Sequence, residues 1–167
     1  MPVEIKDIEA ARELLAGVIT RTPTLHDGRM SETIRANAWV KAECLQKSGS
    51  FKIRGAYNKI SRLSDEEKQR GVITASAGNH AQGVALAAKL HGIKATIVLP
   101  EFAPLTKIMA TRALGAEVIM QGQSFDEAVA YSRGLGEERR LTYVHAFDDD
   151  HVIAGQGTIG FEIAEDL

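Results

Sequence analysis

Short strand and helix patterns alternate through residues 72–145, and this alternation constrains the fold more than any other feature of the sequence. The β-branched runs predict strands over residues 72–76, 94–99, 117–120 and 141–145. The intervening helices are predicted over residues 81–90, 104–114 and 124–133. Strands that alternate with helices form a parallel sheet through right-handed crossovers. We therefore expect an α/β fold, with a parallel twisted sheet, flanking helices and ligands bound at the carboxyl ends of the strands.

Glycine, proline and capping residues set the limits of these helices. Gly92 and Gly115 fit helix C-termini, where a left-handed residue is common. Pro104 suits the first turn of the helix predicted to end at Gly115. Ser124 and Glu127 have the spacing of a capping box, which indicates a helix N-terminus.

The region before residue 70 follows a different pattern. Its predicted elements are a helix with the stripe Leu14, Leu15, Val18 and Ile19, an extended segment over residues 22–25, a strand over residues 38–43, a helix over residues 51–63 and a short helix that starts with a capping box at Ser64 and Glu67. We expect Trp39 and Cys44 in the core, because nothing near this cysteine would activate it as a nucleophile.

Charge, hydropathy and cysteine content exclude several classes of protein. The 167 residues carry a formal net charge of −2 with scattered Lys and Arg, whereas a nucleic-acid surface needs a basic stripe. No apolar run approaches the roughly 20 residues that span a bilayer, and the first residues lack the apolar segment of a signal peptide. Cys44 is the only cysteine, so no internal disulfide is expected. We therefore expect a cytoplasmic protein with no nucleic-acid or membrane partner.

The run Ser48-Gly-Ser-Phe-Lys-Ile-Arg-Gly-Ala56 places Lys52 at the start of a helix. The positive end of a helix disfavours an ammonium group and therefore favours the neutral amine that Schiff-base chemistry needs. The small residues before it would let a ligand approach the backbone closely. The alternative is an ordinary solvated lysine beside a serine cap.

The run Ser76-Ala-Gly-Asn-His80 lies between a predicted strand and a predicted helix. Gly78 allows a tight turn there, and the backbone N–H groups that follow would form an anion site suited to a carboxylate or a phosphate. The Asn79 side chain can both donate and accept hydrogen bonds. The alternative is an ordinary turn in which Asn79 serves as a helix cap.

The run Gly155-Gln-Gly-Thr-Ile-Gly160 matches the letters of a dinucleotide-binding fingerprint. That fingerprint requires a preceding strand and an acidic residue further along the chain, and neither is evident here. We therefore interpret the run as a glycine-rich segment of a packed helix.

An acidic run, Asp148-Asp-Asp150, lies between His145 and His151. The spacing fits no standard metal site, because known structural sites use closely paired ligands. We expect an acidic turn and assign no metal.

Three segments taken together carry a resemblance to a known family. They are residues 48–56, Thr-Ala-Ser-Ala-Gly-Asn-His-Ala-Gln-Gly-Val-Ala over 74–85, and Val-Ile-Ala-Gly-Gln-Gly-Thr-Ile-Gly over 152–160. In order and spacing the chain resembles the threonine dehydratase (threonine ammonia-lyase) family of fold-type-II pyridoxal-phosphate enzymes, to which serine racemase is closely related. The resemblance covers essentially the whole chain and implies the tryptophan synthase beta-like architecture.

The resemblance implies specific roles for the candidate residues. Lys52 is similar to the lysine that holds pyridoxal 5'-phosphate as a Schiff base and then moves the Cα proton. Phe51 is similar to the residue packed against the cofactor ring, and Asn79 to the side chain bonded to its phenolic oxygen. The loop of Ser76, Ala77, Gly78, Asn79 and His80 is similar to the one that holds the substrate carboxylate, mainly through backbone N–H groups.

The implied reaction is α,β-elimination of L-threonine or L-serine to a 2-oxo acid and ammonia, in isoleucine biosynthesis or threonine catabolism. The partner is thus a small amino-acid substrate, and the full-length protein is expected to be a homo-oligomer. Two alternatives stay open: a serine racemase or serine dehydratase, and a non-catalytic fragment of the same family. In serine racemase a serine precedes the Gly-Asn-His of the loop and serves the opposite face of the cofactor, whereas this chain has Ala77.

The resemblance also implies that the chain is the N-terminal half of a two-domain protein. Residues 1–69 belong to the large domain, residues 70–150 form the small domain, and residues 151–167 return to the large domain. Residues 159–167 keep helical spacing with no stop signal, so we expect the chain to be cut inside a helix. The family's phosphate loop and the group facing the pyridine nitrogen lie beyond the chain end, so we expect the 167-residue fragment alone to be inactive.

Overall fold

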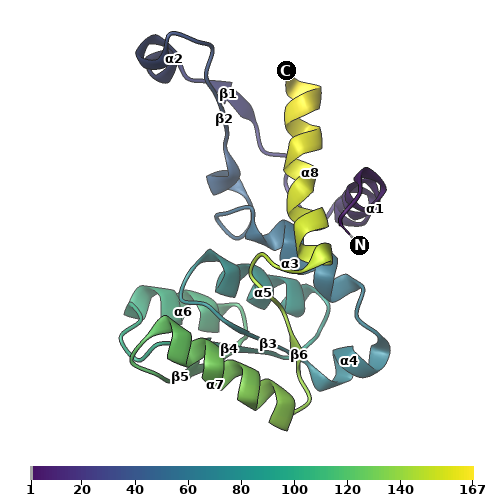
Figure 1. The fold of residues 1–167 in the computed structure, drawn as a ribbon, viewed down its shortest axis with the longest axis vertical. Coiled ribbons are helices and arrows are strands. Elements are labelled where there is room, and N and C mark those ends of the chain that lie inside the picture. Colours follow the sequence, from purple (N-terminus) through teal and green to yellow (C-terminus); the bar gives the residue numbers. More distant parts are fainter. Residues whose placement is uncertain (1) are drawn as a thin grey trace.

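The computed structural model describes residues 2–167. Its helices are α1 (Ile5–Leu15), α2 (Gly28–Ile34), α3 (Lys52–Ser61), α4 (Asp65–Arg70), α5 (Asn79–Leu90), α6 (Leu105–Ala113), α7 (Phe125–Glu138) and α8 (Asp150–Asp166), with a 3-10 turn η1 (Glu43–Leu45). Its strands are β1 (Thr24–His26), β2 (Trp39–Lys41), β3 (Val72–Ala75), β4 (Ala95–Leu99), β5 (Glu117–Met120) and β6 (Thr142–Tyr143). Figure 1 shows an α/β part below, with α1, α8 and the β1–β2 arm rising above it. Among the residues described, no helix is both long and apolar enough to cross a membrane.

The lower part is built on a parallel sheet with the strand order β5-β4-β3-β6. Val72 of β3 pairs with Ala95 of β4 on one side and with Thr142 of β6 on the other. In Figure 1, α5 and α6 lie above this sheet and α7 lies below it. Helices on both faces explain why every residue of β3 and β4 is buried. The arrangement confirms the predicted α/β fold class.

Successive residues of the central strands point to opposite faces and form two apolar clusters. Val72 and Ile97 pack with Val84 of α5 in the larger cluster, which also includes the apolar face of α3. Ile73 packs with Leu135 of α7 in the smaller cluster on the other face. The larger cluster therefore attaches α3 to the sheet through α5.

Helix α1 ends at Leu15, so the prediction that Val18 and Ile19 continue it is wrong. Gly17 adopts a φ of 74°, a left-handed conformation that ends a helix. The amides of Val18 and Ile19 still donate to the carbonyl of Leu15, at 3.0 and 3.3 Å. The apolar spacing thus persists beyond the helix because these residues fold back in a turn.

Helix α7 continues past residue 133, where the sequence predicted its end, and β6 is shorter than the predicted 141–145. Gly136 lies inside the helix because it faces β3. A Cβ atom at this position would lie 3.2 Å from Cγ2 of Ile73. Glycine therefore lets α7 approach the sheet closely and does not end the helix there.

One predicted capping box forms completely and the other in part. Ser64 accepts from the amide of Glu67 at 3.2 Å, and the Glu67 carboxylate accepts from the amide of Ser64 at 2.8 Å. At α7, Ser124 accepts from the amide of Glu127 at 3.2 Å. The Glu127 carboxylate accepts from Gln123, at 2.7 Å, so the reciprocal bond is made one residue earlier than predicted.

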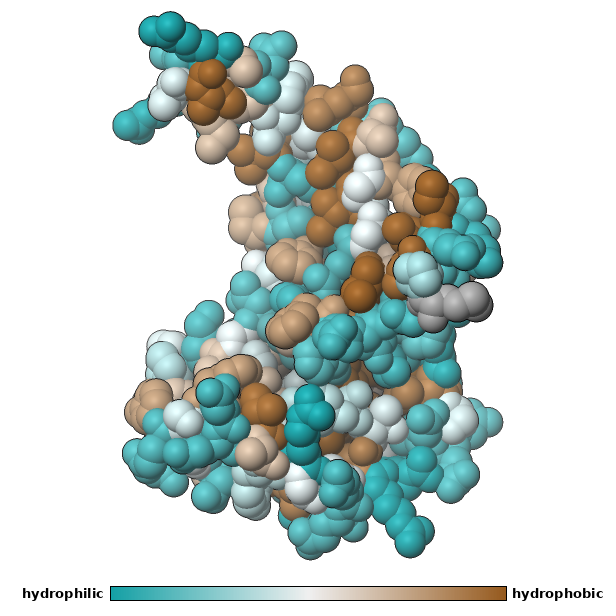
Figure 2. All heavy atoms as spheres, viewed as in Figure 1, coloured by the Kyte–Doolittle hydropathy of each residue, from teal (hydrophilic) through white to brown (hydrophobic). Residues whose placement is uncertain are grey.

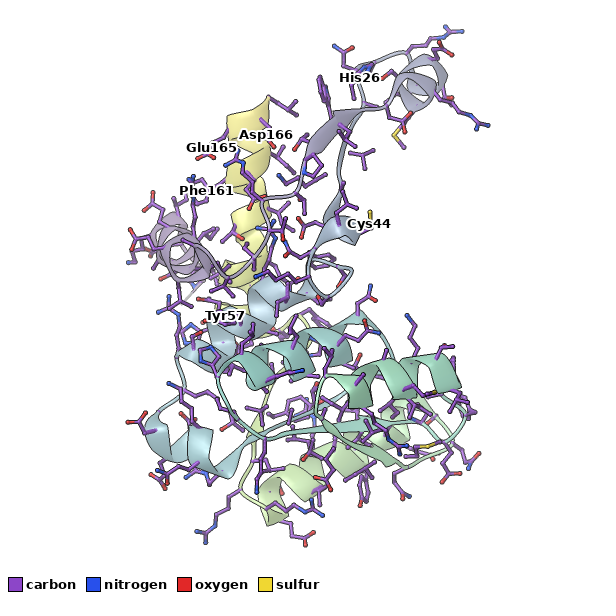
Figure 3. The ribbon with its side chains drawn as sticks, turned by 180° about the vertical axis from the view of Figure 1, so that it is seen from behind. His26, Cys44, Tyr57, Phe161, Glu165 and Asp166 are labelled. Carbon is purple, nitrogen blue, oxygen red and sulfur yellow. The ribbon has the colours of Figure 1, made fainter. Side chains whose placement is uncertain are left out.

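The arm of β1 and β2 extends away from the core, so the prediction that Trp39 and Cys44 are buried is wrong. Trp39 is 46% exposed, and Cys44 is exposed on η1, where Figure 3 shows it beside the base of the arm. The arm is tied to α8 at its base, where Thr24 and Lys41 donate to the Asp166 carboxylate at 2.5 and 3.2 Å. Figure 2 shows that apolar residues also lie on the surface of this upper part.

The glycine-rich run lies inside α8, which confirms its interpretation as part of a packed helix. A Cβ on Gly155 would lie 2.5 Å from the carbonyl oxygen of Arg54 in α3. A Cβ on Gly55 of α3 would lie 2.7 Å from the carbonyl oxygen of Val152 in α8. Gly160, by contrast, has no atom within 4 Å of its Cβ position among the described residues. The first glycine of the run therefore serves the α3–α8 contact.

Gly155→Ala and Gly160→Ala should have opposite effects on the free energy of unfolding. The first forces two helix backbones apart and should cost about 1–3 kcal/mol. The second should gain about 0.5–1 kcal/mol, because alanine restricts the unfolded chain and favours the helix. Urea denaturation of both variants measures the difference. Equal effects at the two positions would contradict the close α3–α8 contact.

Candidate active site

Three segments meet at the carboxyl ends of β3 and β6: the loop before α3, the loop before α5 and the chain that follows β6. The amine of Lys52, the first residue of α3, donates to the carbonyl oxygen of Ala146 at 2.8 Å. His80, in the first turn of α5, donates from Nε2 to the carbonyl oxygen of Val144 at 3.0 Å. The structure thus brings Lys52 and the loop of residues 76–80 to the same strand end, where the parallel topology predicts a ligand site.

Lys52 is held at its backbone from two sides. Gly49, with a φ of 71°, turns the chain before α3, and the Ser50 hydroxyl accepts from the amide of Lys52 at 3.4 Å. On the other side, a Cβ on Gly83 of α5 would lie 3.0 Å from the carbonyl carbon of Lys52. The close contact with α5 therefore fixes where the lysine side chain begins.

The Lys52 amine lies in surroundings that favour its neutral form. Partial burial lowers the pKa of this amine below its ordinary value. The ring centroid of Phe51, the preceding residue, lies 5.0 Å from Nζ; this ring would attract an ammonium, so the lowered pKa comes from burial and not from that contact. The sequence predicted the direction of this shift from the charge at the helix start, and the structure adds desolvation as its cause.

The loop before α5 presents backbone amides rather than side-chain caps. The Ser76 hydroxyl is turned inward and accepts from the amide of Gly78 at 3.2 Å. Gly78 is extended, and no side chain caps the first amides of the helix that it precedes. Ala77 is half-buried and Asn79 is exposed. The N-terminus of this helix therefore offers N–H groups and positive partial charge to an anion.

The side chain of His80 points into the protein, although its backbone belongs to the loop. It is 4% exposed, and its Nδ1 is buried without a hydrogen-bond partner among the described residues. Burial lowers the pKa of His80 to about 4. This effect of burial is larger than the opposite effect of the bond to Val144, and the nearby Lys52 and His145 lower the pKa further. The imidazole is therefore neutral near pH 7, and its contact is with the chain that follows β6.

Arg54 is a further residue of this region that the sequence reading missed. Its guanidinium is fully buried and donates two hydrogen bonds to Glu43, at 2.9 and 2.8 Å. It donates two more to Glu162 of α8, at 2.7 and 2.9 Å. The amine of Lys41 also lies 2.8 Å from Glu162. This cluster ties η1, α3, α8 and the arm together behind Lys52.

A sequence signal for the cluster did exist. Arg54 interrupts the buried face of α3 between Ile53 and Ala56, and Glu162 is a buried carboxylate near the end of α8. A charged residue on a buried helix face requires a partner of opposite charge. Spacing alone did not identify that partner, because the two residues are 108 positions apart.

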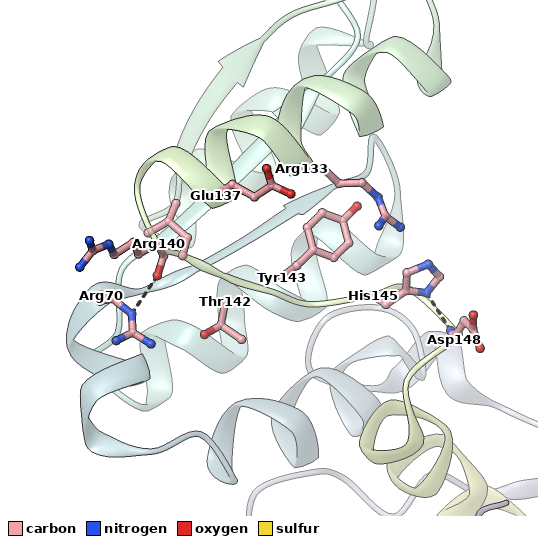
Figure 4. Close-up of a pocket in the computed structure, with 10 residues that line it drawn as sticks. Arg70, Arg133, Glu137, Arg140, Thr142, Tyr143, His145 and Asp148 are labelled. Carbon is pink, nitrogen blue, oxygen red and sulfur yellow. Dashed lines mark hydrogen bonds between the residues drawn. The ribbon is translucent and has the colours of Figure 1, made fainter. Parts of the chain in front are cut away.

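A surface cavity adjoins the site along the outer edge of β6. Its lining includes Arg70, Arg133, Arg140, Tyr143, His145 and Asp148. The Arg133 guanidinium lies over the Tyr143 ring at 5.2 Å, and the amide of Asp148 donates to Nδ1 of His145 at 2.8 Å (Figure 4). Lys52 and the loop before α5 are outside this lining, so the cavity borders the candidate site only at His145.

Comparisons with known proteins agree with this geometry. Residues 15–167 match the model of a family described as "Pyridoxal-phosphate dependent enzyme". The chain is 55% identical to an L-threonine ammonia-lyase of Thermotoga maritima over 165 aligned residues. The aligned residues make up 99% of this chain and 41% of that protein. The processed form of threonine deaminase isoform 2 from Solanum lycopersicum superposes with a TM-score of 0.88 at 44% identity, over 100% of this chain and 48% of its own.

A serine racemase structure from maize superposes with a TM-score of 0.94 at 37% identity, over 100% of this chain and 51% of its own. The chain thus spans about half the length of the relatives that it matches. These likenesses confirm the predicted fold-type-II architecture and the resemblance on which it rested.

Proposed function

This chain belongs to the family of pyridoxal-phosphate dependent enzymes, and from that premise we propose that the protein which carries it is a threonine ammonia-lyase. The substrates are L-threonine and L-serine, and the products are a 2-oxo acid and ammonia. One observation carries the proposal: the half-buried Lys52 amine, with its lowered pKa, lies at one strand end with the uncapped first turn of α5. The 55% identity to an L-threonine ammonia-lyase supports the choice of substrate.

The residues at the site fit the cofactor. Lys52 supplies an amine that is neutral more readily than an ordinary lysine, Phe51 supplies an adjacent ring, and Asn79 an exposed amide. Pyridoxal phosphate, when bound, supplies the electron sink that makes the Cα proton of the amino acid acidic. These three side chains are therefore the proposed holders of the cofactor in this chain.

The residues of the chain then have distinct tasks. The amides of Asn79 and His80 bind the substrate carboxylate, while the amide of Gly78 donates to the Ser76 hydroxyl and shapes the loop. The Lys52 amine takes the Cα proton, and the β-hydroxyl leaves as water once it has received a proton, so that the substrate loses one H2O overall. The enamine so formed takes up water and releases ammonia, which gives the 2-oxo acid. The whole activity is proposed for the full-length protein, because this chain spans about half the length of the relatives that it matches.

The test is to reconstitute the full-length protein with pyridoxal phosphate and to measure 2-oxo acid formed from L-threonine and L-serine. Borohydride reduction followed by peptide mass spectrometry then locates the cofactor. We expect the label on Lys52 and deamination of L-threonine. A label on another lysine, or no deamination of either amino acid, would contradict the proposal.

The second candidate function is serine racemisation, which the superposition on maize serine racemase favours. Racemisation needs a proton-transferring group on each face of the reacting carbon. Lys52 serves one face, whereas the methyl group of Ala77 can neither give nor take a proton. Elimination should therefore prevail in this protein.

Ala77→Ser should raise racemisation from a negligible level to a detectable one, because the hydroxyl supplies a group on the second face. Chiral chromatography of the serine pool after partial turnover measures the D-isomer in both proteins. Abundant D-serine from the protein with Ala77 would overturn the ammonia-lyase assignment in favour of the racemase.

The domain division predicted from the resemblance also belongs to this proposal. Packing of α1 and α3 against α8 supports a shared domain for residues 1–69 and 151–167. The parallel sheet with α5, α6 and α7 supports a separate small domain over residues 70–150. The resemblance further suggests a cytoplasmic homo-oligomer, and size-exclusion chromatography of the full-length protein measures its oligomeric state.

A further inference from the structure

We propose that the carbonyl oxygen of Ala146 is the docking point of the Lys52 amine whenever that amine is not bonded to the cofactor, and that His80 is a positioning residue which holds this carbonyl in place. Any role of this contact in catalysis rests on the proposed function. The docking itself is a property of the cofactor-free protein, so it can be tested separately.

The contact between Lys52 and Ala146 is well placed to orient the amine. Nζ lies 2.8 Å from the carbonyl oxygen, in a partly buried site where an N–H group without a partner is unfavourable. A neutral amine that donates one N–H to this carbonyl keeps its lone pair free in a fixed direction. A base held in this way needs no reorientation before it takes a proton.

The last bond between the sheet and this segment is at Val144, whose amide donates to the carbonyl oxygen of Ile73 in β3 at 2.9 Å. The carbonyl of Val144 accepts from the His80 side chain instead of from the sheet, and the Ala146 carbonyl lies two residues further along. Further along, Nδ1 of His145 accepts from the amide of Asp148 at 2.8 Å. Two imidazoles therefore hold the chain on either side of Ala146, one from α5 and one from the segment itself.

The state of the His80 ring identifies what this residue contributes. A carbonyl oxygen can only accept, so the bond to Val144 requires the proton on Nε2 and leaves Nδ1 with a lone pair. That Nδ1 is buried without a partner among residues 2–167, and an apolar side chain of similar volume would avoid this cost. The feature that histidine adds here is thus the Nε2–H bond. Burial disfavours a second proton on this ring, so the ring stays neutral.

The docking point also suits the return of the lysine. With the cofactor bound, the Lys52 amine would serve in turn as the group that holds the cofactor and as the base that takes the Cα proton. An acceptor fixed within reach keeps the amine close to the reacting atoms instead of letting it swing into solvent.

The experiment measures the reactivity of Lys52 in cofactor-free, full-length protein. Competitive acetylation with acetic anhydride, read by peptide mass spectrometry, gives the labelling rate of each lysine. His80→Leu removes the donor at similar volume, and His80→Gln restores an N–H donor. His91→Leu is the matched control, because this histidine lies at the opposite end of α5 and bonds to the Ser61 hydroxyl, at 2.9 Å, instead of to the segment that carries Ala146.

We expect His80→Leu to raise the labelling rate of Lys52 about fivefold, the scale of one lost hydrogen bond. His80→Gln should return it toward the original rate, and His91→Leu should leave it unchanged. An unchanged rate in His80→Leu would overturn the proposal. A rise that glutamine does not reverse would also overturn it, because general loosening would then be the cause.

A second measurement needs no variant and covers the case that His80→Leu does not fold. In nitrogen-15 lysine spectra of the cofactor-free protein, the amine protons of Lys52 should exchange with water more slowly than those of exposed Lys89. Equal exchange would overturn the docking. If the protein fails to deaminate threonine yet the Lys52 amine is protected from exchange, the proposed function fails and the docking stands. If the protein deaminates threonine yet the Lys52 amine is not protected, the docking fails and the proposed function stands.

Discussion

Replacing Lys52 by alanine in the full-length protein should lower the rate of L-threonine deamination by about 10³-fold or more, the scale of a lost acid–base group. The substitution removes both the amine that bonds to the cofactor and the base that takes the Cα proton. The absorbance of lysine-bound cofactor should disappear as well. Steady-state assays and absorption spectra of the reconstituted protein measure both effects.

Two further variants separate the nucleophile from its charge. Lys52→Arg keeps a positive group at the start of α3, but a guanidinium stays protonated and cannot bond to the cofactor. It should therefore be as inactive as Lys52→Ala. Lys89→Ala removes an exposed lysine of α5 and should keep the original activity. Substantial deamination by the alanine variant at Lys52 would remove this residue from the mechanism.

The parallel sheet could be predicted because its determinants are local. Each β-branched run is flanked by residues that end a helix or begin one, and Gly92 and Gly115 both adopt left-handed φ values, of 66° and 90°. The start of α3 at Lys52 could be predicted for the same reason. Such short-range signals establish where elements lie, and the right-handed crossover rule then establishes how they are arranged.

The errors concern residues whose environment depends on distant parts of the chain. Trp39 and Cys44 have the composition of core residues, but they belong to an arm that extends from the core. Val18 and Ile19 keep helical spacing, but Gly17 ends the helix before them. The local sequence pattern does not predict whether such residues are buried, because burial depends on what packs against a segment as well as on the segment itself.

The candidate site shows the same division. The loop of residues 76–80 and Lys52 were predicted from sequence, and the structure places both at the ends of β3 and β6. The carbonyl of Ala146 could not be predicted, since a backbone acceptor carries no mark in the sequence. Arg54 could be seen as an anomaly on an apolar helix face, but its two carboxylate partners come from other elements.

Arg54→Met should destabilise the protein by about 3–5 kcal/mol at pH 7, the cost of breaking a buried ion pair. The substitution fills much of the volume but leaves Glu43 and Glu162 without the guanidinium from which each carboxylate accepts two hydrogen bonds. Denaturation by urea measures the free energy of unfolding. Arg139→Met is the matched control: its pair with Glu117 is exposed and spans 3.5 Å, so its loss should cost about 0–1 kcal/mol.

The triple variant Arg54→Met, Glu43→Gln, Glu162→Gln distinguishes two causes of the lost stability: unpaired buried charge, and lost hydrogen bonds and packing. Removing the guanidinium alone leaves two carboxylates in a poorly solvated place, whereas the triple variant removes all three of these charges and leaves Lys41 paired with Asp166 at 3.2 Å. It should therefore recover a large part of the stability lost in the single variant. If the triple variant is less stable than Arg54→Met, the loss comes from hydrogen bonds and packing rather than from unpaired charge.

The loss of unfolding free energy caused by Arg54→Met should depend on pH, and this dependence is an independent measure of the charge on the Glu162 carboxylate. Burial raises the pKa of Glu162, but hydrogen bonds from Arg54 and Lys41 outweigh it and hold that pKa below its ordinary value of 4.5. The carboxylate thus stabilises the original protein above pH 4.5, and this stability is lost as the pH falls through the lower folded pKa. Without Arg54 the pKa of Glu162 rises, so this carboxylate takes up its proton at a higher pH. The difference in unfolding free energy between the two proteins should therefore shrink from pH 7 to pH 4, and a constant difference would mean that Glu162 keeps its charge without its buried partner.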